Sequence, residues 1–194
     1  FVPDLGIDKV MIYSFNADAG QLTPAGQAWV ESEPGVGPRH FTFHSSGRLA
    51  YLINEMGSTM STFSYDSGGG RLEQIQTLST LPDDFEGANH TADVHVSPSG
   101  KHLYGSNRGH DSIVVFRVDQ SSGMLERVQL AATRGEIPRN FAIDPGGAFL
   151  LAANQETDSI VSFRRDDDTG LLTETGHLVD VSMPVCLKMA YSTS

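Results

Sequence analysis

Three arginines and one glutamate offer the clearest chemistry in this sequence. Arg39 and Arg139 each follow a proline, whereas Glu55 and Arg108 each follow an asparagine. An arginine presents a planar fork of donors to a carboxylate or a phosphate and can stabilise an oxyanion, and a glutamate can act as a general base. We therefore predict a site for an anionic ligand, with an ordinary ion pair between Glu55 and Arg39 as the structural alternative.

The third arginine and four other polar residues near these positions are candidates for contacts with the same ligand: His40, Asp93, His110, Arg139 and Gln155. A histidine at a loop edge is often a solvated or capping residue, and an aspartate can cap a turn, so these candidates also have structural alternatives. Four further histidines are expected to be structural or to lie on the surface: His44, His95, His102 and His177.

Other chemical motifs are missing from the sequence. It has no paired Cys or His spacing for zinc, no Gly-rich loop followed by a helix, and no Gly-x-Ser-x-Gly elbow. We therefore expect neither a metal nor an organic cofactor. The acidic run Asp166–Asp168 is expected to be a solvated turn, and Cys186 a small buried residue.

The elements that must bring the candidates together follow from an internal repeat. A Gly-x-Leu sequence recurs at Gly20, Gly70, Gly123 and Gly170. An aromatic residue stands nine positions before each of these leucines: Tyr13, Phe63, Phe116 and Phe163. A small polar residue stands nine positions earlier again: Asp4, Asn54, Asn107 and Asn154. Because the landmarks stay in register, whole structural units recur.

Each unit carries the signals of short strands and turns. Residues 40–43, 61–65 and 72–78 alternate between apolar and polar side chains, and residues 49–53 form a short apolar run. Turn residues recur every ~10 positions, which leaves no room for a helix of usual length. Four-stranded units of ~45–50 residues are typical of the blades of a β-propeller, so we predict an all-β propeller fold.

The landmarks also divide the chain into blades. We expect the second half of a blade over 1–37, with strands over 10–15 and 22–30, complete blades over 38–91, 92–137 and 138–183, and the start of another over 184–194. This is about three and a half blades, whereas a closed propeller needs at least about four, so the sequence is expected to be a piece of a longer protein. Extra residues around 81–90 form either a tolerated loop or a rim over the site.

Strand direction places the candidate residues at one end of the propeller. The two innermost strands of a blade are antiparallel, so the start of the first and the end of the second lie at the same end. At the end of the second strand, the three repeats carry an acid, a base and an amide: Glu55, Arg108 and Gln155. We interpret such variation inside a regular repeat as the sign of a site.

Composition limits the partners. The net charge of −11 argues against nucleic acid and anionic membrane surfaces as partners. No apolar run approaches the ~20 residues of a membrane span, and one Cys permits no internal disulfide, which is compatible with the cytoplasm. Open blade edges at the two ends are expected to favour self-association.

Two segments carry a family resemblance. Residues 37–40 read Gly-Pro-Arg-His, and residues 106–113 read Ser-Asn-Arg-Gly-His-Asp-Ser-Ile. The sequence resembles the lactonase family of seven-bladed β-propellers, which includes the propeller-type 6-phosphogluconolactonases and the fungal carboxymuconate-lactonizing enzymes. The resemblance implies a site in a central channel with Arg39, Glu55 and Arg108 as catalytic residues, and a family histidine that would lie just before Phe1.

The activity that the resemblance implies is hydrolysis of a small anionic sugar lactone, foremost 6-phosphogluconolactone of the pentose phosphate pathway, in the cytoplasm. A base, either Glu55 or the histidine before Phe1, would activate water while Arg39 and Arg108 neutralise the oxyanion or the phosphate. Two alternatives remain. One is a cycloisomerase that forms a lactone from a carboxylated muconate, and the other is a non-catalytic propeller that binds a partner.

Overall fold

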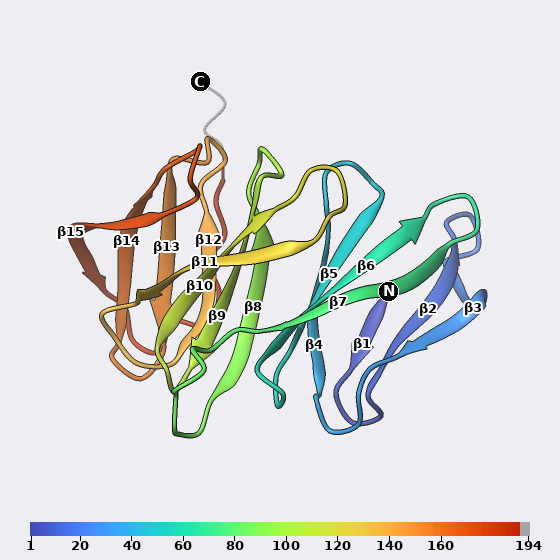
Figure 1. Ribbon diagram of the computed structural model, residues 1–194, viewed down its shortest axis with the longest axis horizontal. Helices are drawn as coiled ribbons and strands as arrows, with labels where there is room; N and C mark the ends of the chain where they lie inside the picture. The colour runs from blue at the N-terminus through green and yellow to red at the C-terminus, as the bar shows by residue number, and fades with distance from the viewer. Residues whose placement is uncertain (191–194) are drawn as a thin grey trace.

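The computed structural model describes residues 1–190, and within them the chain forms fifteen β-strands and no helix. The strands make four antiparallel sheets in which neighbours in sequence pair with each other. Figure 1 shows the sheets side by side, from β1–β3 at the blue N-terminal end to β12–β15 at the red C-terminal end. The predicted all-β blade architecture is confirmed. Among the described residues there is no helix long and apolar enough to cross a membrane.

The first sheet has three strands: β1 (Val2–Asp4), β2 (Lys9–Asn16) and β3 (Gln21–Glu31). The strands expected over 10–15 and 22–30 are present as β2 and β3. β1 was not expected from the sequence, because three residues are too few to show a periodic pattern.

Three four-stranded sheets follow. The second consists of β4 (Pro38–Phe43), β5 (Leu49–Asn54), β6 (Thr59–Asp66) and β7 (Arg71–Ser79). The third consists of β8 (His90–Val96), β9 (His102–Arg108), β10 (Ser112–Val118) and β11 (Leu125–Ala132). The fourth consists of β12 (Pro138–Ile143), β13 (Phe149–Asn154), β14 (Ser159–Arg165) and β15 (Leu172–Asp180).

The first strand of each complete sheet lies on the inner side, where β4 contacts β8 and β8 contacts β12. Residues 184–190 form no strand, but the Leu187 N–H donates to Asn140 Oδ1 at 2.6 Å, so this segment lies beside β12.

Apolar side chains fill the space between neighbouring sheets. Between the third and fourth sheets, Tyr104 and Val115 belong to one buried cluster with Phe141 and Phe163. Similar clusters join the first sheet to the second and the second to the third. The sheets therefore stack face to face, which buries both faces of the inner blades.

A glutamine on the outermost strand links each sheet to the next. Gln76 of β7 donates from Nε2 to the Leu125 carbonyl at 3.1 Å, and its Oε1 accepts from the Leu125 N–H at 2.7 Å. Two equivalent pairs make the same two bonds: Gln27 with Leu72, and Gln129 with Leu172. Each leucine belongs to a Gly-x-Leu landmark, so that landmark marks a contact between blades.

The repeated asparagine is structural. Asn107 at the end of β9 is fully buried, donates to the Thr80 carbonyl and to Ser112 Oγ, and accepts from Thr80 Oγ1 at 2.8 Å. Asn54 and Asn154 are also buried and donate to nearby serines or threonines. These bonds fix the end of each second strand, so the residue that follows emerges at the same place in every blade.

Candidate active site

Glu55 lies between two guanidinium groups. Its Oε2 accepts a hydrogen bond from Arg39 Nη1 at 2.6 Å, and its Oε1 accepts one from Arg108 Nη2 at 2.5 Å. The exposed fractions of the three side chains are 15% for Glu55, 18% for Arg39 and 10% for Arg108. The structure thus brings together the three residues predicted as catalytic. Because two positive charges share one carboxylate, one positive charge is left over. It lies on the inner side of the sheets, along β4, β8 and β12, which we call the inner wall.

Strand ends position this cluster. Arg39 lies at a β-bulge near the start of β4, and a bulge re-aims the side chains beside it. Arg108 is the last residue of β9. Glu55 directly follows β5, and its N–H donates to the Gly37 carbonyl at 2.7 Å while its carbonyl accepts from the Thr91 N–H at 3.1 Å.

The backbone of β8 holds both guanidinium groups. Arg39 Nε donates to the Ala92 carbonyl at 2.9 Å. Arg108 donates to the Thr91 carbonyl at 2.9 Å and to the His90 carbonyl at 3.3 Å. Both forks are therefore oriented before a ligand arrives, which lowers the entropic cost of binding an anion.

The electrostatics of the cluster favour the ionised form of Glu55. Burial raises the pKa of Glu55, but hydrogen bonds from Arg108 and Arg39 outweigh burial and hold this pKa below its ordinary value. A carboxylate with both oxygens on arginines and a lowered pKa is a weak base. The ion pair expected as the alternative for Glu55 and Arg39 is present, and it extends to Arg108.

A second polar cluster surrounds Asp93 of β8. His40 Nδ1 lies 2.8 Å from Asp93 Oδ1, and His95 Nε2 lies 3.0 Å from Asp93 Oδ2. Asn140 Nδ2 and the Phe141 N–H also donate to Oδ2, at 2.5 and 3.3 Å. The Asp93 side chain is 5% exposed, whereas the imidazoles of His40 and His95 are 45% and 40% exposed. The carboxylate is thus buried behind two accessible rings.

The charge of Asp93 is stabilised by its partners. Burial raises the pKa of Asp93, but the hydrogen bonds from His40 and His95 outweigh burial and hold the pKa well below its usual range. His40, Asp93 and Asn140 occupy equivalent positions in the inner strands, and Asn140 passes the contact on to the Leu187 N–H. A row of hydrogen bonds therefore crosses the inner wall from sheet to sheet.

His95 was expected to be structural or to lie on the surface. It is half-buried, and its Nε2 lies 3.0 Å from Asp93 Oδ2, so it belongs to the second polar cluster. The available signal was its position two residues after Asp93 on one strand, which puts both side chains on the same face. The other three histidines match the expectation, since His44 and His102 are buried and His177 is exposed.

The remaining candidates lie around the two clusters. Arg139 of β12 is half-buried, and its charge helps to lower the pKa of Arg108, after burial as the main cause. Gln155 follows β13, and its Oε1 is buried without a hydrogen-bond partner among the described residues. His110 lies at the rim, where its Nδ1 is 2.7 Å from Ser112 Oγ and its ring is 5.0 Å from that of Phe85. The inserted loop therefore packs on His110.

Two expectations outside the site can also be compared with the structure. Cys186 is exposed rather than buried, because residues 184–190 form no paired strand. The run Asp166–Asp168 is an exposed turn in which Asp166 accepts from the backbone of Asp168 and Thr169. Over residues 1–190 no group of three or more His, Cys, Asp or Glu side chains is placed to hold a metal ion.

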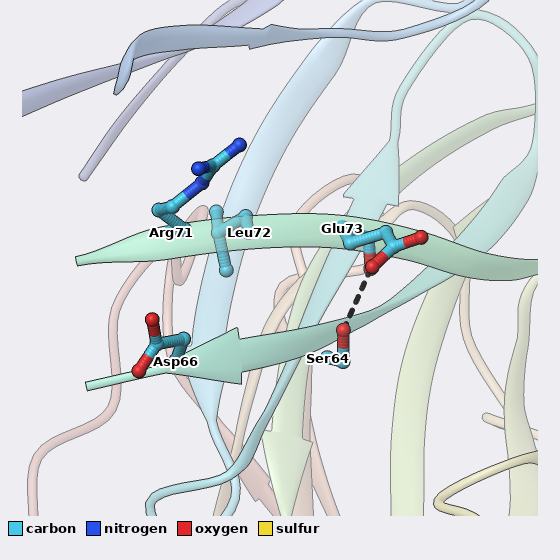
Figure 2. Close-up of a pocket in the computed structure, with 5 residues that line it drawn as sticks. All are labelled: Ser64, Asp66, Arg71, Leu72 and Glu73. Atoms are coloured by element: carbon cyan, nitrogen blue, oxygen red, sulfur yellow. Dashed lines mark hydrogen bonds between the residues drawn. The ribbon is translucent and has the colours of Figure 1, made fainter. Parts of the chain in front are cut away.

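A surface hollow lies at the other end of the second sheet. Figure 2 shows its lining, which consists of Ser64, Asp66, Arg71, Leu72 and Glu73 at the hairpin between β6 and β7. The only hydrogen bond drawn between them runs from Ser64 Oγ to the Glu73 carbonyl, at 3.4 Å. β6 begins near Glu55 and ends at this hollow, so the hollow is separated from the candidate site by the length of a strand.

Comparisons with known proteins agree with this architecture. The family model "Lactonase, 7-bladed beta-propeller" matches residues 1–189. The chain is 41% identical over 188 residues to a 6-phosphogluconolactonase of Bacillus subtilis, and the aligned region covers 97% of this chain and 53% of that protein. It is 44% identical over 148 residues to a 6-phosphogluconolactonase of Formosa agariphila, covering 74% of this chain and 41% of that protein.

A solved structure gives the same result in three dimensions. The periplasmic gluconolactonase PpgL of Pseudomonas aeruginosa matches with a TM-score of 0.90 and 40% identity, over 96% of this chain and 52% of that one. The chain spans about half the length of such relatives. With matched sheets and a family match over nearly all its residues, the chain belongs to the lactonase family of seven-bladed β-propellers.

Proposed function

We propose that the protein containing this chain hydrolyses 6-phosphogluconolactone, and that the four sheets described here act as part of a seven-bladed ring. The observation that carries the proposal is the cluster in which Arg39 and Arg108 share one carboxylate, that of Glu55. Relatives named 6-phosphogluconolactonase and gluconolactonase support the substrate class.

In this reaction water adds to the ring carbonyl, and the carbonyl oxygen gains negative charge. Arg39 and Arg108 stabilise that oxygen with N–H donors held in place by Glu55 and by backbone carbonyls of β8. A preorganised donor of this kind contributes about 100- to 1,000-fold to the rate when it faces a developing oxyanion. Glu55 acts as the clamp that spaces the two guanidinium groups.

The phosphate and the sugar hydroxyls need further contacts. We assign the phosphate to Arg139, because it lies at the start of β12, in the position that Arg39 has in β4, and its side chain is half-buried. Gln155, partly buried directly after β13 at the same end of the sheets, is the candidate for contact with a sugar hydroxyl. His40 and His110 complete the set of substrate-binding candidates, and Asp93, which lies buried behind His40 and His95, supports His40.

The test is an assay of the full-length protein with 6-phosphogluconolactone and with unphosphorylated gluconolactone, each measured against its spontaneous hydrolysis. The proposal predicts acceleration of both reactions, with the higher kcat/KM for the phosphorylated lactone. A higher kcat/KM for gluconolactone would retain lactone hydrolysis but contradict the assigned substrate. No acceleration of either lactone would contradict the proposed function.

The place of this reaction in the cell is part of the proposal. Hydrolysis of 6-phosphogluconolactone belongs to the pentose phosphate pathway, and we place the protein in the cytoplasm. The solved relative from Pseudomonas aeruginosa is periplasmic by its description, so location is decided by cell fractionation with antibodies against the full-length protein. Recovery in the periplasmic fraction would contradict the cytoplasmic assignment.

A further inference from the structure

We propose that His40 is the general base that activates water in this site, and that Asp93 is its positioning residue. The inference rests on the proposed lactone hydrolysis and adds the group that removes a proton from water. Among residues 1–190, the candidate bases beside the arginines are Glu55 and His40, which directly follows Arg39, and their contacts distinguish them.

Glu55 is fully engaged by cations. Each of its two oxygens accepts a hydrogen bond from a different guanidinium group, at 2.5 and 2.6 Å. Taking a proton from water would require one of these oxygens to give up its arginine and would weaken the anion site at the moment when negative charge develops. Glu55 therefore supports the arginines and leaves the proton to another group.

The contacts of His40 suit a base. An ionised carboxylate only accepts hydrogen bonds, so the contact of 2.8 Å between His40 Nδ1 and Asp93 Oδ1 places a proton on Nδ1. In the neutral ring Nε2 is then the acceptor. Among residues 1–190 no hydrogen-bond partner is found for Nε2, and the His40 side chain is 45% exposed. The free lone pair is thus accessible to water.

Asp93 is held firmly enough to orient that ring. Its Oδ1 also accepts from the Val94 N–H at 3.0 Å, and its Oδ2 accepts from Asn140 and from the Phe141 N–H. With the carboxylate fixed by strands β8 and β12, the imidazole on β4 has a fixed tautomer. A buried carboxylate behind a histidine also stabilises the imidazolium that forms during proton transfer.

The base and the arginines contact the same strand, β8. Arg108 contacts the carbonyl of Thr91, Arg39 contacts the carbonyl of Ala92, and His40 contacts the side chain of Asp93. These three contacts fall on consecutive residues of β8. A lactone with its carbonyl oxygen toward the arginines therefore has an imidazole within the same stretch of wall.

The chemical step balances with water alone. His40 Nε2 takes one proton from water as the water oxygen bonds to the carbonyl carbon, and the carbonyl π electrons move to its oxygen beside the arginines. The tetrahedral intermediate then reforms the carbonyl and breaks the bond from carbon to the ring oxygen. The proton on Nε2 passes to that ring oxygen, and the new carboxylic acid ionises in solution.

His95 is the rival histidine on the same carboxylate. Its Nε2 lies on Asp93, so Nδ1 is the acceptor in its neutral ring, and the ring packs edge-on against Phe141 with centroids 4.9 Å apart. His95 lies two residues beyond Asp93 along β8, away from Thr91 and Ala92, whose carbonyls hold the arginines. The geometry therefore assigns His95 to holding Asp93, and its variant separates the two histidines in the experiment.

The test uses the full-length protein with His40→Gln, His95→Gln, Asp93→Asn and, as a control, the exposed outer-strand variant His177→Gln. Loss of a general base predicts that His40→Gln lowers kcat on the preferred lactone by about 100- to 10,000-fold with a smaller change in KM. Asp93→Asn is expected to lower kcat, because His40 is then no longer held in the tautomer that has its proton on Nδ1. His95→Gln lowers kcat by less than ~10-fold, below the range for a lost base, and His177→Gln has no effect. Among these variants, only His40→Gln should regain part of its activity when imidazole is added. A His40→Gly variant, whose smaller side chain leaves more space for imidazole, gives a second test of rescue.

Three outcomes distinguish failure of the role of His40 from failure of the proposed lactone hydrolysis. Full activity of His40→Gln in a protein that hydrolyses the lactone would overturn the role of His40 and leave the proposed function intact. A larger loss of kcat in His95→Gln than in His40→Gln would move the base to His95. Absence of lactone hydrolysis in the wild-type protein, with native circular dichroism, would instead contradict the proposed function.

Discussion

At the scale of single residues, the site depends on two carboxylates, each of which is shared by two neighbouring side chains. Glu55 joins Arg39 and Arg108, and Asp93 joins His40 and His95, so each acid organises two neighbours. Neither acid is free to act alone. The arginine cluster supplies positive charge, and the histidine cluster supplies an accessible nitrogen.

The geometry of Arg108 makes its substitution informative. A lysine keeps the charge but has one nitrogen, so Arg108→Lys cannot contact Glu55, Thr91 and His90 together as the guanidinium does. We expect kcat/KM on the preferred lactone to fall by about 100-fold. The control is Arg117→Lys, which alters an exposed ion pair with Glu126 and should leave kcat/KM unchanged. Equal kinetics for the two variants would show that Arg108 serves only the fold.

Asp93 also predicts a pH dependence of stability. Its folded-state pKa lies well below the ordinary value of ~3.9, so its contribution is complete above that value and is lost as the pH falls toward the folded pKa. Asp93→Asn should reduce the free energy of unfolding at pH 7 by about 1–3 kcal/mol. Urea unfolding of the full-length protein from pH 7 to pH 3 should show the difference between wild type and variant shrinking below about pH 4. A difference that stays constant over this range would contradict the ionised role of Asp93.

At the scale of elements, the repeated landmarks are contacts between blades or fixed strand ends. The Gly-x-Leu leucines receive glutamines from the preceding sheet, and the repeated asparagines close the second strands. The sequence was sufficient to predict the strands of the three complete blades, their order and the end of the sheets that carries Glu55, but not β1 or the absence of a strand over 184–190. It was not sufficient to predict that Asp93 lies between His40 and His95, because that contact depends on how β4 and β8 sit against each other.

The glutamine link can be tested at one blade interface. Gln76→Ala removes two hydrogen bonds to the Leu125 backbone and leaves the buried strand start with unpaired groups. We expect a loss of about 1–3 kcal/mol in the free energy of unfolding. Gln74→Ala on the same strand removes only an exposed contact with Thr77 and should change stability by less than ~0.5 kcal/mol. Similar losses in both variants, measured by urea unfolding, would contradict the link.

At the scale of the whole molecule, the two outer sheets present apolar side chains. In the first sheet Phe15 and Leu22 are 64% and 60% exposed, and in the last sheet Val179 is 61% exposed. The corresponding faces of the inner sheets are buried against neighbours. These two faces are therefore suited to packing against further blades.

The exposed faces predict the behaviour of the 194-residue polypeptide produced by itself. It should self-associate or aggregate, since large exposed apolar patches and open sheet edges favour association. Light scattering during size-exclusion chromatography measures the mass, and the double variant Leu22→Lys and Val179→Lys should shift the distribution toward monomer. A stable monomer of the unsubstituted polypeptide at every concentration would contradict the expectation.

The central claim is that the inner-wall cluster around Glu55 performs lactone hydrolysis. The most direct measurement is kcat/KM of the full-length Glu55→Ala variant on 6-phosphogluconolactone, corrected for spontaneous hydrolysis. The control is Glu73→Ala, which changes an exposed residue of the surface hollow. Because removal of Glu55 releases both arginines, we predict a loss of at least about 100-fold with native circular dichroism, and no change for Glu73→Ala. Full activity of a folded Glu55→Ala protein would contradict the account.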